Sequence, residues 1–185
     1  MFRKAAIVVS IMLLAFVTAC GSHKNASDTS ASGGSAAGAP VSSSATCPTK
    51  ETKKFAKTLF VTDAALAGGA FKHWIYTPAK EGKFKKGAHG RIKSFIKAAA
   101  AGAFTLNRLN AVKKNAESDP LLCKATIGPI TKFTSSIKNL VSGAKHGSVD
   151  PSQVTSANSD LGSFHSDAAK QGNAFTDNQN ASIGG

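Results

Sequence analysis

The chain has 185 residues, too few for more than one ordinary domain once a targeting segment is removed, and 42% are hydrophobic, enough to build a core. Its 23 Lys and Arg against 10 Asp and Glu give a formal net charge of +13. A surface of this charge attracts anions and excludes a calcium-cage protein. Three cysteines leave one thiol unpaired if the other two form a disulfide.

The N-terminus has the pattern of a secretory signal. Arg3 and Lys4 form a basic start, and the apolar run over residues 5–17 is too short to span a bilayer as a stable anchor. The Val-Thr-Ala-Cys sequence that ends at Cys20 resembles the lipobox of bacterial lipoproteins, which implies cleavage before Cys20 and a diacyl lipid on its sulfur. The alternative is an ordinary secretory signal, which would leave Cys20 as an exposed thiol in an oxidising compartment. We therefore expect a signal peptide over 1–19 and a cell-membrane protein, lipid-anchored on the extracytoplasmic face.

A lipid on Cys20 leaves Cys47 and Cys123 as a pair. Disulfides persist outside the cytoplasm, so we expect this pair to be bonded, and two free thiols are the alternative. The loop-entropy model credits such a bond with about 4 kcal/mol.

Small and polar residues fill the stretch after Cys20. Residues 21–46 hold eight Ser, six Ala and four Gly among 26 positions, with no aromatic residue. Such a stretch buries too little apolar area to offset its chain entropy. We expect a disordered tether over 20–46 that holds the domain on the order of 25 to 30 Å from its anchor.

From Cys47 onward, apolar residues recur at spacings of three and four, which predicts helices. The first is expected from about residue 50 to residue 76, ending before Pro78. Asp119-Pro120 and Asp150-Pro151 are start signals for the third and fourth. The expected core positions are Ala56, Phe60, Ala64, Ala67, Phe71 and Trp74 or Ile75; Ile92, Phe95 or Ile96, Ala99, Ala103, Leu106, Leu109 and Val112; Cys123, Ile127, Ile130, Phe133 or Thr134, Ile137 and Leu140 or Val141; and Val154, Ala157, Leu161, Phe164, Ala168 and Phe175.

Four amphipathic helices with short connections predict an all-α, four-helix up-and-down bundle over 47–177, followed by a flexible tail over 178–185. Cys47 precedes the first helix, and Cys123 lies in the first turn of the third. Because these two helices start at the same end of an up-and-down bundle, a disulfide between them fits the topology.

The positive charge is concentrated in the first helical hairpin. Without Arg3 and Lys4 the chain carries 21 basic and 10 acidic residues; the segment 47–118 holds 15 and 4 of these, and the rest of the domain five of each. We expect this hairpin to bind anionic polymers or phospholipid headgroups, although a solvated surface that only keeps the domain soluble is the alternative. The candidate anion-binding residues are Lys72, Lys80, Lys83, Lys85, Lys86, Arg91, Lys93 and Lys97, with Trp74 and Tyr76.

The sequence predicts no enzyme. Ser94-Phe95-Ile96-Lys97 and Ser135-Ser136-Ile137-Lys138 fit the S-x-x-K pattern of penicillin-recognising enzymes, but the accompanying Lys-Thr-Gly is absent. Metalloprotease, hydrolase, phosphate-loop and dinucleotide motifs are also missing. No catalytic residue, cofactor or metal is therefore expected.

A haem or metal carrier of the envelope is the alternative function. His73 and Tyr76 are three residues apart on one expected helical face, and His89 follows in the next loop. These three residues are the alternative haem ligands.

Three segments resemble uncharacterised small secreted helical proteins of high-GC Gram-positive bacteria: FKHWIYTP at 71–78, DPLL at 119–122 and DPSQVTSANS at 150–159. The resemblance implies a place in the cell envelope and transfers no active site. The expected function is that of a membrane-anchored, non-enzymatic binding module of the envelope, whose basic first hairpin engages anionic components. Its protein partner and oligomeric state are left open.

Overall fold

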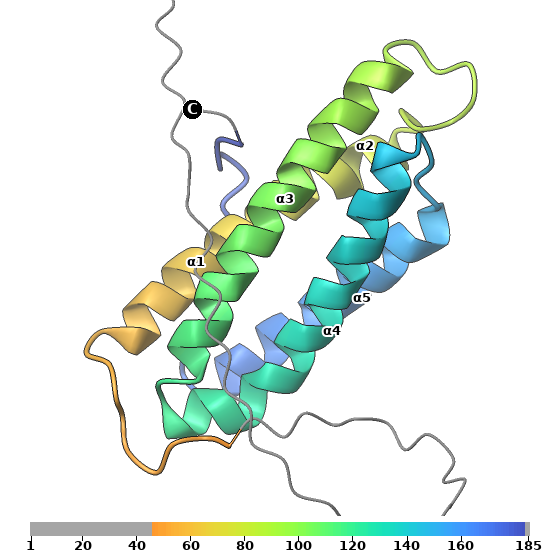
Figure 1. Cartoon of the computed structure of the whole chain (residues 1–185). Coiled ribbons are helices and arrows are strands. Elements are labelled where there is room, and N and C mark those ends of the chain that lie inside the picture. Colours follow the sequence, from red (N-terminus) through yellow and green to blue (C-terminus); the bar gives the residue numbers. More distant parts are fainter. Residues whose placement is uncertain (1–45, 184–185) are drawn as a thin grey trace, which may run out of the picture. The chain divides into compact units, whose positions relative to one another are not determined.

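Four long helical segments run antiparallel in the part of the chain that the computed structural model describes, residues 46–183 (Figure 1). The expected signal peptide, Cys20 and all of the expected tether except Thr46 lie outside these residues. The elements in chain order are α1 (Ala56–Phe71), the π-helical turn η1 (Lys72–Tyr76), α2 (Thr77–Lys80), α3 (Arg91–Ala116), α4 (Pro120–Lys145) and α5 (Pro151–Lys170). No helix in this range combines the length and apolar character needed to cross a bilayer.

The helices form the all-α, up-and-down bundle that the sequence predicts. Each packs on the next in the order α1, α3, α4 and α5. The Phe60 and Phe164 rings, 5.7 Å apart between centroids, join α1 to α5 and close the bundle, while Phe71 and Phe133 meet edge to face at 5.5 Å. The largest fully buried side chains are those of Phe60, Phe71, Phe133, Phe164, Ile75, Leu109, Leu122, Ile130, Ile137, Leu140, Leu161 and Val112.

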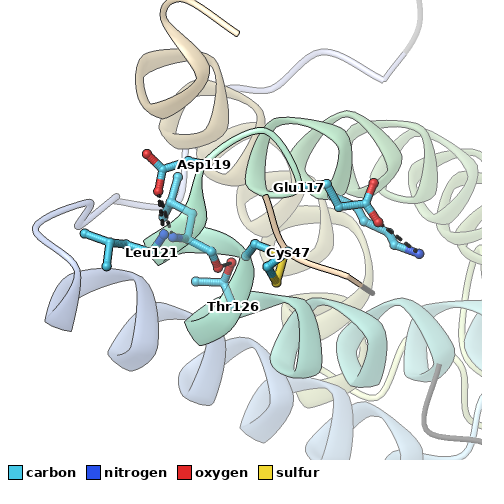
Figure 2. Close-up of a disulfide and its surroundings, with 8 residues drawn as sticks. Cys47, Glu117, Asp119, Leu121 and Thr126 are labelled. Atoms are coloured by element: carbon cyan, nitrogen blue, oxygen red, sulfur yellow. Dashed lines mark hydrogen bonds and ion pairs between the residues drawn. A yellow bond between two sulfur atoms is a disulfide. The ribbon is translucent and has the colours of Figure 1, made fainter. Parts of the chain in front are cut away.

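The Cys47–Cys123 disulfide confirms the predicted pairing, with 5.6 Å between the two Cα atoms. Figure 2 shows Cys47 beside the start of α4, where the polypeptide enters the described domain. The bond therefore fixes the entering chain to the third long helix, 76 residues further on.

The first helix starts later and ends later than predicted. Residues 50–54 are not helical, because the chain crosses the end of the bundle there and the Thr52 amide donates to the Ser118 carbonyl at 2.9 Å. The helix continues through Pro78 because it widens into the π-helical turn, in which the Thr77 amide donates to the Lys72 carbonyl. In α geometry the proline ring would clash with the carbonyl four residues before it.

The buried face of α3 is also rotated from the prediction. Leu109 and Val112 are buried as expected, and so is Phe95, the alternative to the exposed Ile96, but Ile92 and Ala103 face solvent. Residues 98–103 are nearly all alanine, so the apolar pattern alone does not fix which side faces the core. Gly102 decides it, because it lets α3 approach Val141 of α4 so closely that an added Cβ would lie 2.2 Å from a Val141 methyl.

The segment after α5 packs along α1, and the domain extends beyond the boundary expected at residue 177. The Asn178 amide donates to the Ala65 carbonyl at 2.9 Å, and Ala181 is 5% exposed. The Asp177 carboxylate meets His165 Nε2 of α5 at 2.9 Å. The described part of the expected tail, 178–183, therefore packs against the domain because it carries its own polar and apolar contacts.

Both predicted aspartate caps are present. Asp119 Oδ1 accepts hydrogen bonds from the Leu121 and Leu122 amides, each at 2.9 Å, as Figure 2 shows for Leu121. Asp150 accepts from the amide and the hydroxyl of Ser152, and these hydrogen bonds, the side-chain one first, lower the pKa of the Asp150 carboxyl. Both carboxylates therefore act as acceptors for the unpaired N–H groups that begin α4 and α5.

Asp119→Ala is expected to destabilise the domain by about 1–2 kcal/mol, because a buried cap loses two hydrogen bonds and the ion pair of its Oδ2 with Lys57 at 3.4 Å. Urea unfolding followed by circular dichroism measures the loss. Asp150→Ala, at an exposed cap, is the control and should cost less. Equal losses of stability in the two variants would show that the burial of Asp119 does not increase the stability that this cap provides.

Candidate anion-binding site

Whereas other basic residues of the first hairpin, such as Lys53 and Lys57, lie at the disulfide end, most of the residues predicted to bind anions lie at the opposite end of the bundle. This end is formed by α2, the loop 81–90, the start of α3 and the end of α4 (Figure 1). Six exposed lysines lie on the loop and its flanking helices, and we call them the basic end: Lys80, Lys83, Lys85, Lys86, Lys93 and Lys97. Only Glu81 offsets them within 72–97, and its carboxylate lies 3.9 Å from Lys83 Nζ in an exposed ion pair of small energy.

The loop that carries these lysines is held by its own aromatic anchor. Phe84 is buried and its ring centroid lies 5.2 Å from that of Phe95 on α3. Gly82, Gly87 and Gly90 take positive φ angles of 72°, 82° and 71°, a backbone region that residues other than glycine rarely occupy. The short loop can therefore reverse direction while keeping its lysines in solvent.

Arg91 holds this end of the bundle together. Its Nε donates to the Phe84 carbonyl at 3.0 Å, and a terminal nitrogen donates to the Gly147 carbonyl at 2.8 Å. Its guanidinium also lies over the Phe95 ring, 4.6 Å from the centroid. Of the residues predicted to bind anions, Arg91 thus has a structural role that links the loop, α3 and the segment after α4.

An open pocket of about 350 Å³ lies between the first helix and the start of α3. It joins residues from four separate stretches of chain. The stretch formed by η1 and α2 contributes His73, Trp74, Thr77 and Pro78, and the loop contributes Glu81 and Lys83. Helix α3 contributes Ser94 and Lys97, and the C-terminal segment contributes Gln179. Two lysine ammonium groups, the Glu81 carboxylate, an indole and several neutral hydrogen-bonding groups therefore surround one space, and Glu81 is already paired with Lys83.

Trp74 is the centre of this pocket's chemistry. The π-helical turn places Ile75 in the core and leaves Trp74 partly exposed beside the pocket. Lys97 Nζ lies 4.6 Å from the indole centroid, and the His73 ring meets the indole edge to face at 4.6 Å. The indole Nε1 is buried without a hydrogen-bond partner among the described residues. An unpaired buried donor is costly, so a ligand acceptor that reached it would gain from the pairing.

Two of the predicted residues face another part of the bundle. Lys72 donates to the Asn158 side chain of α5, and its Nζ lies 4.6 Å from the centroid of the Tyr76 ring. Tyr76 in turn packs against Phe71 at 6.2 Å. Neither lines the Trp74 pocket, so the ten predicted residues are not one surface.

Two pocket residues had no signal in the sequence. Thr77 and Gln179 are ordinary polar residues, and Gln179 is brought in only by the docking of the C-terminal segment. Ser94 and Lys97 belong to an S-x-x-K pattern and both line the pocket. The Ser94 hydroxyl nevertheless donates to the Gly90 carbonyl at 3.3 Å, and Lys97 lies over the indole, so their polar atoms have other partners.

The alternative haem ligands do not share a pocket. His73 lines the Trp74 pocket, but Tyr76 contacts Phe71 and Lys72, and His89 is exposed on the loop. Residues three apart diverge more in the wider π-helical turn than in an α-helix. In residues 46–183, no three His, Cys, Asp or Glu side chains gather as a metal site would require.

The chain matches no protein-family model, and neither the curated proteins nor the solved structures contain a match to it. The site therefore has to be interpreted from its own chemistry. Exposed ammonium groups beside an indole can bind a phosphate-bearing or carboxylate-bearing chain and hold an adjoining ring or apolar group.

Proposed function

We propose that the protein is a non-enzymatic binding module of the bacterial cell envelope, anchored by a lipid on Cys20, and that its basic end binds phosphate-bearing polyanions. The observation that carries the proposal is the pocket in which Trp74, Lys83 and Lys97 meet at the basic end. The proposal assigns the remaining exposed lysines of the basic end to neighbouring phosphates along the same polymer.

Electrostatics favour such a ligand for a simple reason. Six ammonium groups within 18 residues repel one another, and a polyanion that lies across them relieves this repulsion and releases its own counterions. Such binding weakens steeply with salt, and an affinity measured between about 50 and 200 mM salt should fall at least about tenfold.

The test uses the only tryptophan of the chain, because Trp74 lies in the proposed site. Titration of the full chain with inorganic polyphosphate should give a saturable change in tryptophan emission. Changing Lys83, Lys85 and Lys86 together to Glu should reduce the affinity at least about tenfold, because three phosphate contacts become repulsions.

The matched control changes three exposed lysines of α4, Lys124, Lys132 and Lys138, to Glu. This variant has the same net charge as the first but keeps the basic end. It should retain most of the affinity. Equal losses in the two variants would mean that polyphosphate responds to overall charge, and the proposed site would be rejected.

A further inference from the structure

The outer face of α3 carries apolar side chains that no part of the described domain covers. Ile92 is 76% exposed and Ile96, one turn later, is 66% exposed. Ala99, Ala100 and Ala103 continue the same stripe along the helix with partial or full exposure. Isoleucine belongs to the residue types most often buried, so two of them adjacent in solvent indicate a surface that meets an apolar partner.

A shallow groove borders this stripe on the side of α4. It has a volume of about 440 Å³, and its apolar lining comes from Ile92, Phe95, Ile96, Ala99 and Ala144. The rim is basic on both sides. Arg91 and Lys145 line the groove itself. Lys93 and Lys97 each follow an exposed isoleucine by one residue and are themselves exposed.

Charge decides which partner fits. Two copies of this chain that met through the stripe would bring like-charged rims together, which opposes self-association. Here the exposed isoleucines lie between Lys93 and Lys97 on one side and Lys145 on the other. Such a helix face has the form that binds at the interface of an anionic bilayer, where the lysines meet headgroup phosphates and the apolar side chains enter the acyl boundary. The stripe runs along the side of α3, so this contact would lay the bundle axis along the membrane plane.

We propose that α3 docks on an anionic phospholipid surface by inserting Ile92 and Ile96 between the headgroups, with Lys93 and Lys97 paired to phosphates. This inference rests on the proposed function, because Lys93 and Lys97 belong to the basic end that is proposed to bind polyanions. It names an anionic bilayer as one of those polyanions. The isoleucines are the new element, because a purely electrostatic site for a soluble polymer does not use them.

A local probe tests the insertion in the full chain, whatever holds the N-terminus. Trp74→Phe removes the native tryptophan, and Ile96→Trp places a single indole on the stripe. With vesicles of phosphatidylglycerol and phosphatidylcholine, this indole should shift its emission to the blue and be quenched by brominated acyl chains. Vesicles of phosphatidylcholine alone should give neither effect, because the lysines then lack a net negative surface.

The matched control is Ser159→Trp in the same background, an exposed position on α5, which packs against α4. Its indole should show neither effect. Equal quenching at both positions, or none at the Ile96→Trp indole, would overturn the inference. The double variant Ile92→Ser, Ile96→Ser should leave polyphosphate binding unchanged. If only bilayer insertion is lost, the proposed function stands. If the wild-type protein fails to bind polyphosphate, that result counts against the proposed function directly.

Discussion

Removing the disulfide by Cys47→Ala and Cys123→Ala is expected to lower the free energy of unfolding by about 4 kcal/mol. The bond closes a loop between residues 76 positions apart, and without it the unfolded chain regains the freedom of that loop. A domain of this size has a total stability of about 5–15 kcal/mol, so the variant should be near the threshold of folding. Urea unfolding followed by Trp74 emission measures the change.

The control for this experiment is the wild-type protein under reducing conditions. Cys123 is buried, so the alanine variant also loses some packing, whereas the reduced protein loses only the bond. The reduced protein should show most of the same decrease. Equal stability of the oxidised and reduced proteins would contradict a stabilising role for the bond.

Gly69→Ala should destabilise the domain by about 2–3 kcal/mol, because a Cβ on Gly69 would lie 1.8 Å from the Asn178 carbonyl oxygen and 2.2 Å from its carbon. The obstacle is backbone, so the C-terminal segment has to move away and its hydrogen bond to Ala65 is lost. This cost exceeds the advantage of about 1 kcal/mol that alanine has over glycine inside a helix. Urea unfolding measures the stability, and hydrogen exchange at the Asn178 amide reports the docking.

Gly162→Ala in α5 provides the comparison, because a Cβ there meets nothing within 4 Å. It should stabilise the domain by about 0.5–1 kcal/mol, the opposite sign from the same substitution at Gly69. If both substitutions were stabilising, the packing of the C-terminal segment on α1 would be refuted.

Sequence patterns predicted the bundle well where a helix has a clear capping signal or bulky apolar residues on one face only. The Asp-Pro pairs gave the starts of α4 and α5, because the cap and the first-turn proline act locally. The bulky apolar stripes of α4 and α5 gave their buried faces, whereas the alanine-rich start of α3 left its rotation to the contact of Gly102 with Val141. Ile92, which the pattern assigned to the core, was therefore found on the surface, beside Ile96, the alternative to the buried Phe95.

The candidate site was predictable in its charge but not in its shape. The lysine cluster and Trp74 are visible in the sequence, because local composition shows them directly. The pocket depends on the π-helical turn before Pro78 and on Gln179, a residue that reaches it only when the C-terminal segment docks on α1. Both are tertiary outcomes without a local pattern. The use of Arg91 as a link between two carbonyls was hidden for the same reason.

The position of the disulfide also determines how the domain responds to a pull. Tension applied to the chain before Cys47 passes through the sulfur bridge into the start of α4, at one end of the bundle. Residues 48–55 lie between the bridge and α1 and are bypassed by that path. A force from the N-terminal side therefore enters the domain at the start of α4 and does not pull on the start of α1 through residues 48–55. While the bond is intact, such a force cannot unfold α1 from its N-terminal end, and the basic end that follows α1 stays in place.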